Sequence, residues 1–143
     1  MEQKPYDSVA NSTFTFDPTN KVIGVFDDAG DATDALLDLG AAGFSAEEVD
    51  ILTGVEGARR IGVSVGGREV SVHIFRPAQK VPAFYDAPVI ARRVKQELQA
   101  GHYLLGVTAK SVEARERARE ILKSLGGHFI NFYGRLAAEG LEP

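Results

Sequence analysis

The sequence predicts an α+β fold, a ferredoxin-like plait built from two βαβ repeats with a β-hairpin and a helix inserted between them. Residues 21–54 and 103–134 each have the pattern of strand, helix and strand, and aligning them places Gly24 opposite Gly106. Residues 55–102, between the repeats, instead combine alternating apolar residues, three prolines and a late amphipathic stretch. Two copies indicate an internal duplication rather than a solenoid array.

Length and composition fit a single globular domain. The chain has 143 residues, of which 44% are hydrophobic and 25% charged, enough to bury a core without cross-links. The absence of cysteine excludes a disulfide framework, thiol catalysis and iron–sulfur clusters. Neither a secretory signal nor a membrane span is predicted, so we expect a cytoplasmic protein. We expect a flexible N-terminal arm over residues 1–20, one domain over 21–136 and a C-terminal tail over 137–143.

The first repeat begins with an apolar run at residues 22–26, which is typical of a buried strand. Asp28 or Asp31 is expected to cap the helix that follows, and acidic residues crowd its first turns, where the helix dipole favours them. Gly43 is a plausible helix stop, and residues 49–53 predict a second strand. The expected apolar face of the helix consists of Ala32, Ala35, Leu36 and Leu39.

The second repeat follows the same plan. Residues 103–108 predict a strand, Ser111 is expected to cap a helix, and Gly126-Gly127 to stop it. Residues 128–133 predict a final strand because they are rich in strong β formers. The expected apolar face of this helix consists of Ala114, Ala118, Ile121, Leu122 and Leu125.

The segment between the repeats predicts two further elements. Ile61–Val65 and Arg68–Phe75 read as the strands of a β-hairpin, joined by Gly66-Gly67, which tolerates the positive φ angles of a two-residue turn. A helix is predicted from about Asp86 to Ala100, with Ile90, Val94 and Leu98 on its apolar face.

Several of these segments resemble the bacterial general stress protein 17M-like domain, also called the heat-induced stress protein domain. The similar residues are the strand Val22–Phe26 with its helix and the strand VDIL, the element ELQAGHYLLGV, and the turn GGHFI. The resemblance covers residues 21–54 and 93–136. It implies a stress-associated bacterial context and supplies no catalytic residue. Many members carry a glycine-rich or polar helical insert, whereas this chain has a hairpin and a proline-rich loop.

Two histidines are candidate metal ligands. His102 and His128 each precede a strand of the second repeat, so parallel strands would bring both imidazoles to one end of the sheet. Two histidines and a carboxylate could bind a metal ion there. The sequence has no His-x-His or His-x-x-x-His spacing, and both residues also fit an exposed position at a strand entrance. We therefore expect no metal site, no cofactor and no catalytic residues, and we expect the protein not to be an enzyme.

The acidic residues at the start of the first helix could also bind a divalent cation through oxygen. The segment that begins at Asp27 lacks the EF-hand pattern and its distal glutamate. Asp31, Asp34 and Asp38 have the spacing of one helix face. We therefore expect a solvated acidic face rather than a cation site.

The two aligned glycines allow two readings. A strand glycine permits close approach, so Gly24 and Gly106 could form the floor of a ligand site or a dimer contact, or could accommodate a tightly packed helix. Phe129, Asn131 and Tyr133 lie on one face of the last strand by alternation. Since the plait has helices on one face, we expect a partner subunit, the hairpin or the arm to cover the other.

Function is less constrained than fold. Acidic residues are concentrated before residue 59 and basic residues after it, which suits either a polyanion partner or halves that complement each other. We expect a non-enzymatic, stress-associated module that self-associates, most simply as a homodimer. The alternative is a sensor of a small anionic ligand, for which Arg92 and Arg93 are candidates. Nucleic-acid binding is not expected, because the net charge is −4 and the RNA-recognition-motif octapeptide is absent.

Overall fold

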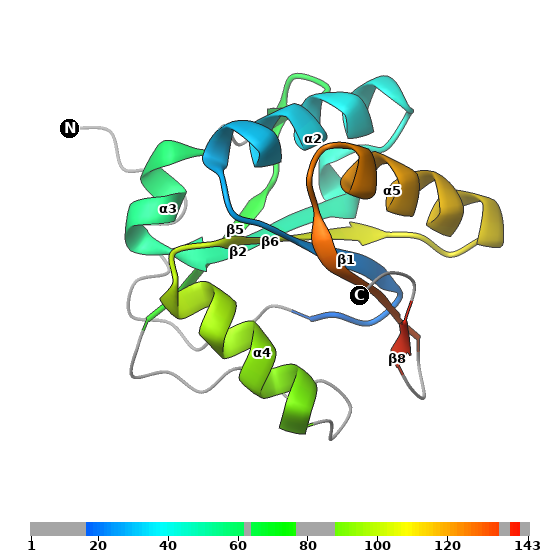
Figure 1. Cartoon of the computed structure of the whole chain (residues 1–143). Helices are drawn as coiled ribbons and strands as arrows, with labels where there is room; N and C mark the ends of the chain where they lie inside the picture. The colour runs from blue at the N-terminus through cyan, green and yellow to red at the C-terminus, as the bar shows by residue number, and fades with distance from the viewer. Residues whose placement is uncertain (1–16, 62–63, 77–87, 135–137, 141–143) are drawn as a thin grey trace.

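The computed structural model describes residues 17–61, 64–76, 88–134 and 138–140, which form an α+β fold around one mixed sheet (Figure 1). All neighbouring strands of this sheet are antiparallel except β2 and β5, which are parallel. The six strands lie in the order β5 (Ser71–Phe75), β2 (Val49–Gly54), β6 (Tyr103–Thr108), β1 (Lys21–Phe26), β7 (His128–Tyr133) and β8 (Ala138–Gly140).

The first repeat forms β1, α2 (Ala29–Ala41), the 3-10 turn η1 (Ala46–Glu48) and β2. Asp28 caps α2, because its side chain accepts a hydrogen bond from the Gly30 N–H at 2.6 Å. Gly43 follows the helix with a φ of 98°, in the left-handed region that favours glycine. The predicted apolar face is confirmed, since Ala32, Ala35, Leu36 and Leu39 are buried.

The second repeat forms β6, α5 (Val112–Ser124) and β7. The Ser111 hydroxyl accepts a hydrogen bond from the Ala114 N–H at 3.1 Å, as expected of a helix cap. In Figure 1, α2 and α5 lie side by side on one face of the sheet. Their core includes Val22, Phe26, Leu36, Leu105, Leu122, Ile130 and Phe132.

The opposite face of the sheet is covered by α4 (Pro88–Gln99), the helix predicted between the repeats (Figure 1). A second apolar cluster forms there from Ile23, Val25, Leu52, Phe75, Val94, Leu98, Leu104 and Tyr133. The expectation that a partner subunit, the hairpin or the arm covers this face is corrected. The apolar stripe of α4 packs on it within the same chain, and Tyr133 is only 1% exposed.

The rest of the insert differs from the predicted hairpin. The segment after β2 forms a short helix, α3 (Val55–Arg60), which was not predicted and contains Gly57, a poor helix former. A small hairpin of β3 (Ser64–Val65) and β4 (Arg68–Glu69) does turn at Gly66-Gly67, with φ angles of 59° and 80°. The predicted strand 68–75 is interrupted at Val70, because the chain then leaves the hairpin and pairs with β2 as β5.

None of the helices in the described residues has the length and apolar character needed to cross a membrane. Residues 17–20 of the predicted arm form a turn, in which the Lys21 N–H donates to Pro18 O. The predicted C-terminal tail over 137–143 is corrected at residues 138–140, which pair with β7 as the strand β8. Residues 1–16 of the arm and residues 137 and 141–143 of the tail lie outside the described residues.

Candidate metal-binding site

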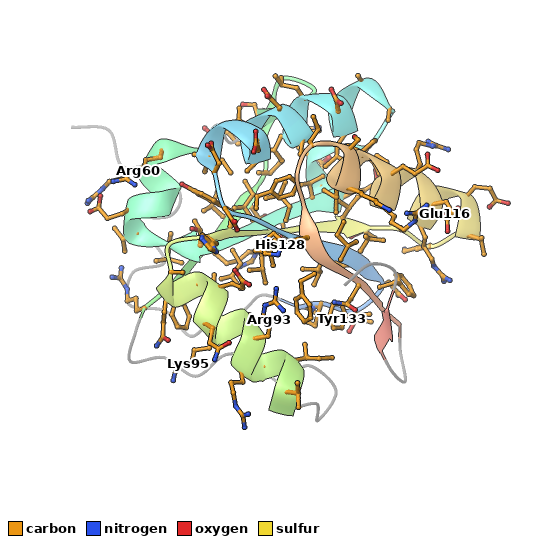
Figure 2. The ribbon with its side chains drawn as sticks, in the orientation of Figure 1. Arg60, Arg93, Lys95, Glu116, His128 and Tyr133 are labelled. Carbon is orange, nitrogen blue, oxygen red and sulfur yellow. The ribbon has the colours of Figure 1, made fainter. Side chains whose placement is uncertain are left out.

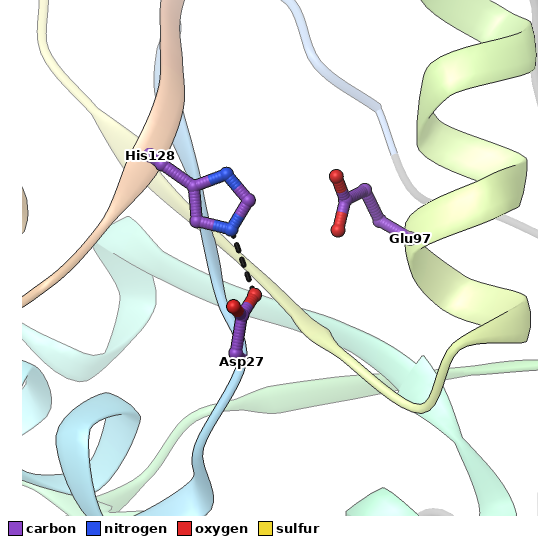
Figure 3. Close-up of side chains that lie close together, drawn as sticks. All are labelled: Asp27, Glu97 and His128. Atoms are coloured by element: carbon purple, nitrogen blue, oxygen red, sulfur yellow. Dashed lines mark hydrogen bonds and ion pairs between the residues drawn. The ribbon is translucent and has the colours of Figure 1, made fainter.

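Four ionisable side chains meet at one end of the sheet, beside α4, and we call them the His–carboxylate cluster: Asp27, Glu97, His102 and His128. Figure 3 shows Asp27, Glu97 and His128. His128 Nε2 lies 2.7 Å from Asp27 Oδ1, although 101 positions separate the two residues in the chain. His102 Nδ1 lies 2.6 Å from Glu97 Oε1 and 3.2 Å from Asp27 Oδ1. The fold therefore brings both repeats and the insert together at this point.

Strand pairing explains why both histidines lie at this end. β6 and β7 are each antiparallel to β1 and are therefore parallel to each other. The start of β6 and of β7 faces the end of β1, where Asp27 follows directly. His102 precedes β6, and Phe26 pairs with Tyr103 in the adjoining row. The predicted meeting of the two histidines was conditional on parallel strands, and that condition holds.

A β-bulge turns His128 toward the cluster. Ile23 pairs with Asn131 and Val25 with His128, so β7 has one residue more than β1 across this interval. Phe129, within the bulge, has a φ of +49°, which is rare for a bulky residue. Regular alternation would place His128 on the same face as Ile130, under α5. The bulge instead aims its side chain at the face covered by α4, where Glu97 lies.

Both carboxylates of the cluster favour the ionised form. The hydrogen bond with His128 lowers the pKa of Asp27 below its ordinary value, and the charges of His102 and Arg93 act in the same direction. Burial raises the pKa of Glu97, but hydrogen bonds with His102 and Arg93 outweigh it, so that its net pKa is also lowered. The Glu97 side chain is 11% exposed and that of Asp27 is 60% exposed, so the cluster is anchored inside and open to solvent outside.

Arg93 borders the cluster and points from α4 toward β7, the strand of His128 and Tyr133 (Figure 2). Its Nε donates to Glu97 Oε2 at 2.6 Å, and its Nη2 lies 3.4 Å from His128 Nδ1. The guanidinium carbon lies 4.5 Å from the centre of the Phe129 ring, in the geometry of a cation–π contact. Contacts with Glu97, His128 and Phe129 therefore fix the Arg93 guanidinium, and the first two of these residues are candidate metal ligands.

The arrangement has the donor atoms of a divalent metal site. One ligand atom from each of Asp27, Glu97 and His128 lies within 4.8 Å of the other two. Two carboxylate oxygens and one imidazole nitrogen are ligands for Zn²⁺, Mn²⁺ or Fe²⁺. His102 lies outside this set of three, but it contacts both carboxylates and is placed to orient them.

The candidate residues named from the sequence are dispersed. Gly24 lies beneath α5, where a Cβ would approach Leu122 Cδ1 to 3.2 Å and Ile130 Cγ1 to 3.3 Å. Of the readings offered by the sequence, this contact corresponds to a glycine that accommodates a tightly packed helix. Gly106 is buried and pairs with Ile23 on one side and Asp50 on the other.

The remaining candidates divide between surface, core and cluster. Arg92 is exposed, whereas Arg93 borders the cluster and contacts Phe129. Asn131 is half-buried and its amide donates to Phe129 O, and Tyr133 belongs to the core under α4. The expected interface of Phe129, Asn131 and Tyr133 is thus largely occupied within the chain, because α4 packs against that face.

Asp27 and Glu97 are not among the site residues predicted from the sequence. Asp27 was considered there only as part of an acidic segment that we expected to face solvent. Asp27 carried a usable signal, since an acid that follows β1 must lie near the residue that precedes an antiparallel neighbour. Glu97 had no such signal, because its position depends on the docking of α4.

Comparisons with protein-family models, curated proteins and solved structures found no match for this chain.

Proposed function

We propose that this protein binds one divalent transition-metal ion through Asp27, Glu97 and His128. The observation that carries the proposal is the convergence of their three ligand atoms within 4.8 Å, at a position that is half-open to solvent. The 2.7 Å between His128 Nε2 and Asp27 Oδ1 is a hydrogen-bond distance. Ligand atoms around a tetrahedral ion with bonds of about 2.0 Å lie about 3.3 Å apart. To admit the ion, exposed Asp27 would move away from His128, and any pair of ligand atoms nearer the 4.8 Å limit would move closer together.

We further infer that the scaffold is a ferredoxin-like plait. The strand order β2-β6-β1-β7, with every neighbour antiparallel, supports this, as do the two strand–helix–strand repeats with both helices on one face. β5 then extends this four-stranded unit at one edge and β8 at the other. In such a plait the ends of the two central strands meet the loops of both repeats, and the cluster lies at this junction.

The biological setting stays a prediction from the sequence. The resemblance to the general stress protein 17M-like domain implies a stress-associated bacterial role, and a cytoplasmic location and a homodimer are likewise expected. A homodimer would have to use residues other than Tyr133, which is 1% exposed within the subunit. A metal-binding module without catalysis is consistent with each of these predictions.

Zinc binding by the purified full chain tests the proposal, and the molecule offers a matched control. His73 Nε2 lies 3.1 Å from Asp50 Oδ1, which is a second half-buried His–Asp pair outside the cluster. After treatment of the protein with a chelator, calorimetric titration with Zn²⁺ is expected to show one site per chain. His128→Gln should weaken binding by at least about tenfold, since even the partners of metal ligands contribute about 10–100-fold.

The control variant His73→Gln should bind zinc like the wild type, and circular dichroism should confirm that both variants are folded. Mg²⁺ provides a second comparison, because it prefers an all-oxygen octahedral shell and should bind more weakly than Zn²⁺. Failure of the folded wild type to bind zinc, or equal binding by His128→Gln and the wild type, would refute the proposal.

A further inference from the structure

We propose that the metal-loaded site also binds a small oxyanion, between the ion and the guanidinium of Arg93. The inference rests on the proposed function, since the anion would occupy a coordination position of the ion. Three protein ligands leave at least one such position open in a four-coordinate ion. Carboxylate, sulfate and phosphate groups share the required chemistry, an anionic oxygen that binds both a cation and an arginine.

Arg93 is held ready for this role. Its Nε bond to Glu97 Oε2 and its stacking on Phe129 fix the plane of the guanidinium, while 39% of the side chain stays exposed. Nη1 has no hydrogen-bond partner among the described residues, so its two N–H groups are available to a ligand. A planar arginine with one anchored edge is well suited to bind an oxyanion with the other.

Metal binding through Nε2 of His128 would change what Arg93 faces. A guanidinium has only donors, so the 3.4 Å contact with Arg93 Nη2 requires a lone pair on His128 Nδ1 and a hydrogen on Nε2, directed at Asp27. An ion at Nε2 needs the lone pair there, which leaves the hydrogen on Nδ1. Two donors then face each other 3.4 Å apart, so Arg93 Nη2 loses its acceptor on His128 and becomes available to donate to an oxyanion oxygen.

The formal charges also favour binding of the anion after the metal ion. Asp27 and Glu97 each carry one negative charge and Arg93 carries one positive charge, so these three side chains together have one net negative charge. A divalent ion reverses this to one net positive charge. The metal-free cluster should therefore repel an anion and the loaded cluster attract it, so that metal and anion bind with positive coupling.

Zinc titrations in chloride, sulfate and acetate at one ionic strength test the inference. Sulfate or acetate should tighten zinc binding by the wild type by at least about fivefold relative to chloride, the lower range of typical coupling between sites. Sulfate alone would identify a tetrahedral oxyanion, and acetate alone would identify a carboxylate. Arg93→Gln should bind zinc more weakly than the wild type, because Arg93 also holds Glu97. Its zinc affinity should be the same in sulfate or acetate as in chloride, because the second anchor of the anion is removed.

The matched control is Arg92→Gln, which removes the same charge from the exposed neighbouring position on α4 and should keep the enhancement. If Arg93→Gln loses zinc binding through Glu97, Arg93→Lys retains the charge and should show a reduced enhancement. Zinc binding that neither anion strengthens would overturn the oxyanion site and leave the metal site intact. A wild type that binds no zinc would overturn both, and an enhancement unchanged in Arg93→Gln would exclude Arg93.

Discussion

Lys21 Nζ lies 3.2 Å from Asp50 Oδ2, although Lys21 is on β1 and Asp50 on β2, two strands that are not neighbours. β6 runs between them, and its residue paired with Asp50 is Gly106, which places no side chain between the two groups. His73, on β5, approaches the other oxygen of Asp50 at 3.1 Å. A polar network therefore spans four adjacent strands of the sheet, and the glycine makes this possible.

This network predicts a dependence of stability on pH. Burial raises the pKa of Asp50, but the hydrogen bond with His73 and the charge of Lys21 outweigh it, so the net pKa lies below its ordinary value of 3.8. The unfolded chain thus binds this proton at a higher pH than the folded chain does. The contribution of Asp50 to stability is present above about pH 4 and is lost as the pH falls through the lowered pKa.

The measurement is the free energy of unfolding as a function of pH, for the wild type and for Asp50→Asn. The wild type should lose stability on acidification more steeply than Asp50→Asn, which cannot release a proton at this position. Asp34→Asn, on an exposed part of α2, is the control and should follow the wild type. If the free energy of unfolding fell equally steeply with acidification in the wild type and in Asp50→Asn, the role of the network would be contradicted.

Gly24 predicts a steric limit under α5. The side chains nearest to it, Leu122 and Ile130, are both fully buried, and a Cβ at Gly24 would already approach them to 3.2 and 3.3 Å. Gly24→Val should lower the free energy of unfolding by about 1–3 kcal/mol, the usual effect of overpacking. Gly24→Ala should have a smaller effect. Denaturant unfolding measures both.

Gly54 supplies the control for this prediction. A Cβ there would meet only Phe75 O, at an ordinary 3.8 Å, and its φ of −77° suits any residue. Gly54→Ala should leave stability unchanged or raise it by up to about 1 kcal/mol, by restricting the unfolded chain. If Gly24→Val were as stable as the wild type, α5 would not be packed tightly over the strand.

His102 predicts an effect on metal affinity without direct coordination. Its Nδ1 contacts Glu97 Oε1 at 2.6 Å and Asp27 Oδ1 at 3.2 Å, so it holds two of the three proposed ligands. His102→Gln should weaken zinc binding by about 10–100-fold, as is typical for partners of metal ligands. Calorimetric titration measures this, with His73→Gln as the unaffected control. Unchanged zinc affinity in His102→Gln would show that Asp27 and Glu97 do not need His102 to hold them in position.

The sequence predicted the elements that depend on local chemistry. Both repeats, the caps at Asp28 and Ser111, and the two histidines at one sheet end follow from apolar periodicity, capping preference and strand direction. Two features of the site depend on long-range packing. α4 brings Glu97 to the sheet only when it docks on the second face, and the bulge at Phe129 reverses the alternation that otherwise assigns His128 to the other side.

The docking of α4 connects the fold to the site, because this helix carries both Glu97 and Arg93. Leu98 is 3% exposed within the apolar cluster on that face. Leu98→Ala should lower the free energy of unfolding by about 2–5 kcal/mol, through lost burial and the cavity that remains. Leu37→Ala, at a position that is 63% exposed on α2, should change it by less than about 0.5 kcal/mol.

Zinc binding by the same two variants separates stability from site assembly. Since Leu98 anchors the turn of α4 that carries Glu97, a folded Leu98→Ala variant should bind zinc more weakly than the wild type, whereas Leu37→Ala should bind it equally well. Titration below the unfolding temperature of each variant makes the comparison. If Leu98→Ala were destabilised but kept full zinc affinity, Glu97 would reach the ion without the docked helix, and Asp27 and His128 would have to define the site.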